Sequence, residues 1–177
     1  MIRRPLRLAT ALAAVAALLA GCQAPGTAAT VNGERITDRE VSQVVADWRE
    51  WVNPQYSNLQ AVGSLVLARV VEPVAGDHGM AISDQQVVTL LNEDRDRFGM
   101  EPVEESDLSP AFLDALRSEL WFSGLQSGQA APEFGEAVNT ALTDVDVEIN
   151  PRYGVQGTEG ELFMPDTPEW IATSSAR

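Results

Sequence analysis

The sequence predicts a mainly helical domain in which a short N-terminal strand or hairpin pairs with a strand near the C-terminus. Apolar residues recur at helical spacing through most of residues 37–142. Asn32-Gly33 stands between two short β-prone runs, which is typical of a hairpin because both positions of its tight turn need a positive φ. Residues 144–149 alternate acidic and apolar side chains, as a strand with one buried face does.

Capping residues mark where most of the predicted helices begin. Residues 37–40 (TDRE) and 83–86 (SDQQ) form capping boxes, in which a hydroxyl and a Glu or Gln side chain satisfy free backbone N–H groups reciprocally. Ser109-Pro110 supplies an N-cap followed by proline at the first helical position, and Pro132 opens a shorter last helix. Gly99 is expected to end the helix that starts at residue 83.

The second helix lacks such clear boundaries. Apolar residues at helical spacing predict that it runs from about Tyr56 to Val71. Pro73, Gly76 and Gly79 then predict a ragged end, because proline removes a helical N–H and glycine weakens a helix.

The N-terminus has the pattern of a bacterial lipoprotein leader. Three arginines within residues 3–7 precede an apolar run from Leu8 to Ala20, which is short for a membrane span. The run ends in Leu19-Ala20-Gly21-Cys22, with small residues before the only cysteine of the chain. We expect Cys22 to be diacylated and, after cleavage before it, to become the new N-terminus, which anchors the chain to the outer face of the cytoplasmic membrane.

Four segments follow from this pattern. Residues 1–21 are the predicted signal peptide, residues 22–28 a tether, residues 29–154 the folded domain and residues 155–177 an irregular tail. Without the leader, 9 arginines and no lysine stand against 26 acidic residues, a formal charge of −17. Such a charge opposes binding to nucleic acids and to anionic lipid, because both depend on basic side chains.

Residues for catalysis or metal binding are scarce. His78 is the only histidine and lies in a glycine-rich break, which excludes a site built from several histidines. Asp94 and Asp96 resemble the start of a calcium loop, but Arg97 or Phe98 occupies a required position in either register. We therefore predict no enzyme, cofactor or metal site, although the sequence leaves open a carboxylate pair among its 26 acids.

Aromatic and methionine side chains favour a binding role instead. The chain has four tryptophans, of which Trp48 and Trp121 lie on inward helical stripes, whereas Trp51 and Trp170 are harder to place in a core. Aromatic and thioether side chains offer large, adaptable contact areas. Trp51, Met80 and Met100 are the predicted contributors to an apolar groove.

Three segments resemble one family of extracytoplasmic folding factors. Residues 29–37 (ATVNGERIT) are similar to the opening of SurA-like and PrsA-like proteins, residues 79–87 (GMAISDQQV) to the link into their next helix, and residues 147–154 (VEINPRYG) to the strand that closes the chaperone domain in actinobacterial lipoproteins. The resemblance implies that this strand returns to the N-terminal one. Too few residues separate the last helix from that strand to hold a parvulin isomerase domain, and the paired histidines of that domain are absent.

The resemblance therefore implies a membrane-anchored holdase that binds unfolded secreted polypeptides without prolyl isomerase activity. An alternative from a different class is a scaffold lipoprotein that holds one specific partner in the cell envelope. The two differ in selectivity, because a holdase binds many clients whereas a scaffold binds one partner at fixed stoichiometry.

Overall fold

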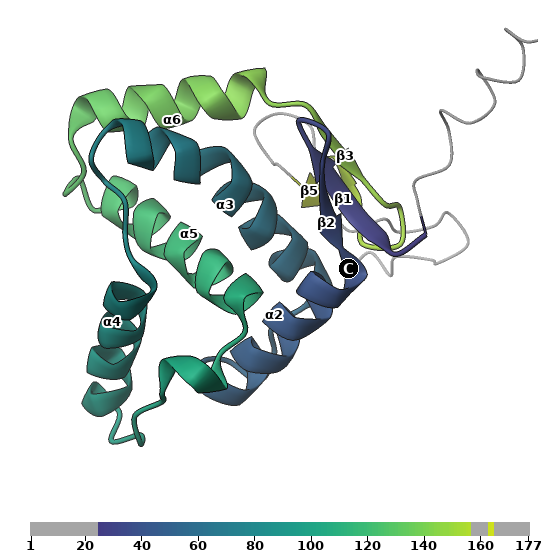
Figure 1. Cartoon of the computed structure of the whole chain (residues 1–177). Helices are drawn as coiled ribbons and strands as arrows, with labels where there is room; N and C mark the ends of the chain where they lie inside the picture. Colours follow the sequence, from purple (N-terminus) through teal and green to yellow (C-terminus); the bar gives the residue numbers. More distant parts are fainter. Residues whose placement is uncertain (1–24, 157–162, 165–177) are drawn as a thin grey trace, which may run out of the picture.

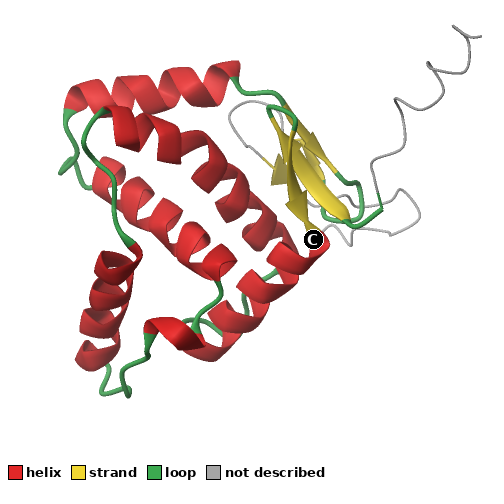
Figure 2. Cartoon of the chain, in the orientation of Figure 1, coloured by secondary structure: helices red, strands yellow, loops and turns green. Residues whose placement is uncertain are grey.

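A computed structural model describes residues 25–156 and 163–164 (Figure 1). Cys22 and Trp170 lie outside these residues. The elements in chain order are β1 (Thr27–Val31), β2 (Glu34–Thr37), α2 (Asp38–Trp51), α3 (Asn58–Asp77), α4 (Asp84–Arg97), the 3-10 turn η1 (Glu105–Asp107), α5 (Pro110–Gln126), α6 (Pro132–Asp144), β3 (Val147–Ile149), β4 (Val155–Gln156) and β5 (Phe163–Met164). Helices make up most of the fold, and the strands gather at one end of it (Figure 2).

The predicted hairpin and its pairing with a C-terminal strand are confirmed. The strands β2, β1 and β3 form an antiparallel sheet in that order. Asn32 and Gly33 have φ values of 50° and 82°, as the tight turn requires. Two hydrogen bonds add to the strand pairing, because Asn32 N donates to Asp146 O at 2.8 Å and Asp146 N donates to Asn32 Oδ1 at 3.0 Å.

The C-terminal β segments differ in extent from the prediction. The strand expected at residues 144–149 is shorter, because α6 continues to Asp144 and β3 begins only at Val147. Val147 and Ile149 pack against the core whereas Glu148 is exposed, which is the expected alternation. The tail predicted to be irregular contains the short antiparallel pair β4–β5, so that prediction is wrong for these residues.

The helix α3 forms the centre of the domain. It is the one described helix that is long and apolar enough to cross a membrane by length and composition, but half of its apolar window is buried inside the fold. It runs to Asp77, so the predicted end near Val71 is wrong. Pro73 is exposed inside the helix, and the burial of Val71 and Ala75 beside it keeps the backbone helical past the proline.

Two apolar clusters form the core. The larger lies among α2, α3, α4, α5 and the sheet, where Trp48 stacks on Tyr56 at 4.3 Å and meets the edge of Phe112 at 5.4 Å between ring centroids. The smaller joins α3, α5 and α6 around Trp121 and Phe134. Trp48 and Trp121 are 7% and 4% exposed, in agreement with their predicted inward stripes.

The helix α4 packs mainly on α5, where its Val87 and Leu91 join the larger apolar cluster. In Figure 1, α3 and α5 run side by side, α2 and α6 lie on opposite sides of them, and α4 stands off at the lower left. The predicted capping box at its start is present, since Ser83 Oγ accepts from Gln86 N and Gln86 Oε1 accepts from Ser83 N. The helix ends at Arg97, and Gly99 follows with a φ of 66°, as predicted.

Candidate binding site along helix α5

A groove of about 330 Å³ separates α4 from α5. Its apolar lining comes from both helices and from the end of α2, and its charged lining comes from α4 alone. We call it the α4–α5 groove; its lining residues are Val52, Val87, Leu90, Leu91, Glu93, Asp94, Arg97, Leu116, Leu120 and Ser123.

A second hollow of about 220 Å³ lies further along α5. We call it the α5–α6 pocket; its lining residues are Met80, Ile82, Leu120, Trp121, Gly124, Gln129, Ala130 and Phe134. Leu120 belongs to both hollows, so they adjoin, and together they form what we call the α5 trough. The segment from Leu116 to Gly124 covers two helical turns, about 12 Å of length at about 1.5 Å per residue.

Large apolar side chains remain exposed beside the trough. Leu90 and Val52, which line the α4–α5 groove, are each 42% exposed. Phe122 on α5 is also 38% exposed but is not among the lining residues of either hollow. On α4, Val87 and Leu91 are one turn apart and buried, whereas Leu90 projects from another part of the helix surface. The trough therefore presents apolar surface that the domain itself leaves uncovered.

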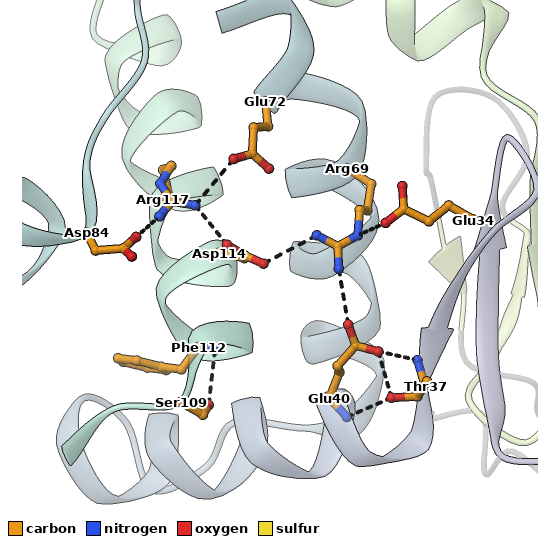
Figure 3. Close-up of polar contacts among 10 residues, drawn as sticks. All are labelled: Glu34, Thr37, Glu40, Arg69, Glu72, Asp84, Ser109, Phe112, Asp114 and Arg117. Atoms are coloured by element: carbon orange, nitrogen blue, oxygen red, sulfur yellow. Dashed lines mark hydrogen bonds and ion pairs between the residues drawn. The ribbon is translucent and has the colours of Figure 1, made fainter. Parts of the chain in front are cut away.

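Buried arginines hold the two ends of α4. At its beginning, Arg117 of α5 forms an ion pair with Asp84 and donates from Nε to Ile82 O at 2.8 Å, and it also contacts Asp114 and Glu72 (Figure 3). Asp114 also pairs with Arg69 of α3, which extends the network to the hairpin. The guanidinium of Arg117 is therefore a junction between α5, α3 and the start of α4.

At the other end of α4, Arg95 is 8% exposed and ties the helix to the end of α2. Its Nη1 donates to Trp51 O at 2.6 Å and its Nε donates to Glu101 O at 2.8 Å, while its guanidinium lies 5.3 Å from the Trp51 ring centroid. Asn92 adds a reciprocal pair of hydrogen bonds to the backbone of Val103, each 2.9 Å long. Directional polar contacts thus position α4 at both ends, with the groove between them.

Negative charge gathers at the C-terminal end of α4. Glu93 and Asp94 line the groove there, and Asp94 pairs with Arg97 at 3.5 Å while both side chains stay more than half exposed. An ion pair this exposed neutralises its partners weakly. Residues 93–107 contain seven acids and two arginines, a formal charge of −5, and every one of these acids is exposed. The lining of the α5–α6 pocket carries no charged side chain.

The predicted groove residues lie in different places. Met80 lines the α5–α6 pocket, where its carbonyl oxygen accepts from Trp121 Nε1 at 2.9 Å. Trp51 is half-buried under Arg95 and adjoins the groove only through the next residue, Val52. Met100 is 41% exposed and is not among the lining residues of either hollow.

Three apolar residues of this site, Leu90, Leu116 and Leu120, were not among the predicted groove residues. Leu90 could have been found, because it stands next to the inward stripe of its helix rather than on it. Leu116 and Leu120 could not, because they belong to the inward stripe of α5 and are opened to solvent only by the distance of α4.

Tyr56 is the buried titratable group of the larger core. Burial raises its pKa to about 12; a hydrogen bond with Ser64 opposes this shift and the charge of Glu119 adds to it. Its hydroxyl lies 2.7 Å from Ser64 Oγ, which donates to Glu119 at 2.9 Å. Tyr56 is therefore neutral at physiological pH and serves as a structural hydrogen-bonding group.

Groups suited to catalysis do not converge in the part of the chain that the structure covers. His78 is exposed at the end of α3, with its ring 6.0 Å from that of Phe134. Within residues 25–156 and 163–164, no three His, Cys, Asp or Glu side chains are placed to hold a metal ion. No protein-family model matches the chain, and no curated protein and no solved structure matches it.

Proposed function

We propose that this chain is a lipid-anchored extracytoplasmic holdase that binds unfolded secreted polypeptides at the α5 trough and has no prolyl isomerase activity. The lipid on Cys22 would hold it at the outer face of the cytoplasmic membrane. The observation that carries the proposal is the open apolar trough, with Leu90 and Val52 left exposed in its lining. The resemblance of residues 29–37, 79–87 and 147–154 to SurA-like and PrsA-like folding factors supports the same function.

The size of the trough suits weak and reversible binding. Burying one large apolar side chain contributes about 1.5–3 kcal/mol, so two or three client side chains contribute about 3–9 kcal/mol. Association of two molecules costs about 4–15 kcal/mol in translational and rotational freedom. A site of this size therefore holds a client briefly and releases it, which is what a holdase without an energy source requires.

The charge of the chain supports the same role. A formal charge of −14 for the whole sequence, and of −17 without the leader, opposes self-association of domains that expose apolar surface. Because the charges surround the trough at one end only, apolar client side chains still reach Leu120 and the α5–α6 pocket.

An aggregation assay tests the proposal. Residues 23–177, which include every residue that the structure describes, are mixed with several unrelated denatured clients on dilution, and light scattering reports aggregation. We expect suppression at near-stoichiometric ratios beyond the effect of serum albumin. Replacing Leu90 and Val52, the two exposed residues of the groove lining, with serine should weaken suppression, whereas Phe98→Ser should not, because Phe98 is 75% exposed but lines neither hollow.

The outcome of that assay also separates the holdase from the scaffold lipoprotein. Absence of suppression for every client would refute the holdase, and affinity capture of one stoichiometric partner would then favour the scaffold. The anchor has its own test, since Cys22→Ser should move the chain from the membrane fraction to the soluble fraction and remove the acyl mass from its N-terminal peptide.

A further inference from the structure

The α5 trough differs in charge from one end to the other, which restricts what it can bind. Glu93, Asp94 and Arg97 line the end formed by α4, and residues 93–107, with seven acids and two arginines, carry a formal charge of −5 there. This is also the C-terminal end of α4, where the helix dipole is negative. The opposite end, the α5–α6 pocket, has a lining without charge.

The occupant also has to satisfy its own backbone. The trough is formed largely by side chains of α4 and α5, whose interior backbone N–H and C=O groups are bonded within their helices. An extended peptide buried there would leave its backbone groups unpaired, at a cost of a few kcal/mol for each group. A helical peptide satisfies its own groups and can place apolar side chains at positions i, i+3/4 and i+7 into a groove of about 12 Å.

From these two properties, and on the basis of the holdase function proposed above, we infer that the α5 trough selects apolar helical segments with a cluster of arginine or lysine at one end. The basic end lies at Glu93 and Asp94, and the apolar turns lie along Leu120 toward the α5–α6 pocket. Export leaders have this chemistry, with a basic start followed by an apolar run. The trough is therefore suited to chains that still carry such a segment.

Charge disfavours two other occupants. A second copy of the chain would bring 26 acids against 12 basic residues to an already acidic rim. The C-terminal residues 165–177 contain Asp166, Glu169 and one arginine, at the last position, so they offer no basic cluster.

Peptide binding tests the inference directly. Two labelled peptides share one helix-forming apolar sequence; one begins with three lysines and the other with three glutamates. Binding to residues 23–177, shown to be folded by circular dichroism, is followed by fluorescence anisotropy. We expect the lysine peptide to bind about tenfold more tightly than the glutamate peptide at low salt, because three exposed charge pairs each contribute modestly. At high salt we expect this preference to shrink to about twofold, because salt screens exposed charges.

Matched variants locate the preference. The double variant Glu93→Gln/Asp94→Asn should lose most of it, whereas Glu133→Gln/Glu136→Gln on α6, which removes the same charge from residues that line neither hollow, should retain it. A lysine peptide interrupted by a central proline should bind more weakly, because it cannot remain helical.

Each of the other possible results would refute one part of the inference. Equal binding of the two peptides, in a chain that suppresses aggregation through Leu90 and Val52, would refute the charge selection and leave the holdase standing. Equal binding of the proline-interrupted peptide would refute the helical occupant. A preference unchanged in Glu93→Gln/Asp94→Asn would place the site elsewhere. Dimerisation that is lost in Leu90→Ser would show that a second copy fills the trough.

Discussion

Raising the pH above about 10 should destabilise the fold through the single buried phenol of Tyr56. This side chain is 5% exposed, stacks on Trp48 and is hydrogen-bonded to Ser64. Its pKa rises from the ordinary value of 10.0 to about 12 because burial disfavours the phenolate. In the unfolded chain the same phenol would ionise near pH 10, so above that pH the unfolded state binds fewer protons than the folded state.

The sign and size of the effect follow from this difference. The folded state keeps its proton up to about pH 12, so stability is fully present below about pH 10 and falls as the pH rises from about 10 to about 12. Each tenfold difference in acidity corresponds to about 1.4 kcal/mol, so the free energy of unfolding should decrease by about 2–3 kcal/mol over this interval. The chain has no lysine, which removes the groups that would otherwise titrate in the same range.

Urea unfolding at a series of pH values measures the decrease. Tyr153→Phe leaves Tyr56 as the only tyrosine, so the near-ultraviolet absorbance of this variant reports the ionisation of Tyr56 directly. Tyr56→Phe should be less stable by about 1 kcal/mol at neutral pH, through loss of a hydrogen bond, but should lack the alkaline decrease. A decrease of the same size in Tyr56→Phe, or a flat profile in the wild type, would refute the assignment.

Three further changes test the core, a helix cap and the attachment of α4. Phe112→Ala should cost about 3–5 kcal/mol in urea unfolding, because Phe112 is fully buried, whereas Phe122→Ala should cost less than about 1 kcal/mol. Thr37→Ala should cost about 1 kcal/mol by the same measurement, because the Thr37 hydroxyl caps the start of α2; no change would show that water replaces the cap. Arg95→Met should cost about 1–3 kcal/mol and speed hydrogen exchange in α4, because two backbone carbonyl groups lose their donor. The exposed Arg97→Met is the control for this change, and equal exchange in the two variants would contradict the role assigned to Arg95.

The features predicted correctly from the sequence depend on local chemistry. Asn32-Gly33 fixes the hairpin because few other residue pairs accept its positive φ values. The boxes at Thr37 and Ser83 fix helix starts because each hydroxyl satisfies an N–H only three residues away. The end of α3 was predicted wrongly, since burial of Val71 and Ala75 against α5 and α6 outweighs the local effect of Pro73.

The candidate site was predictable only in part, because it depends on how helix α4 is placed against α5. The sequence indicated that apolar side chains outside the core would bind, and Met80 does line a hollow. Trp51 instead contacts Arg95, which lies over its ring and donates a hydrogen bond to its carbonyl oxygen. The two residues are 44 positions apart, so no local sequence pattern reveals this contact. Leu116 and Leu120 looked like ordinary core residues.

The position of α4 explains why the α5 trough stays open. Apolar contact alone would draw Leu90 onto Leu116 and Leu120, since nothing in an apolar interaction fixes its direction. The contacts at the ends of α4 are directional: Arg117 fixes its start through Asp84 and the Ile82 carbonyl, and Arg95 fixes its other end through the Trp51 carbonyl. Moving α4 toward α5 would break several hydrogen bonds of charged groups, each of which contributes about 1.5–3 kcal/mol. Burial of the single side chain of Leu90 would contribute only about the same as one of these bonds. The arginines thus hold α4 where apolar surface of α5 stays uncovered. Arg95→Met therefore tests the proposed peptide binding as well as stability: a variant that lets α4 close should lose peptide binding while the core around Phe112 remains folded.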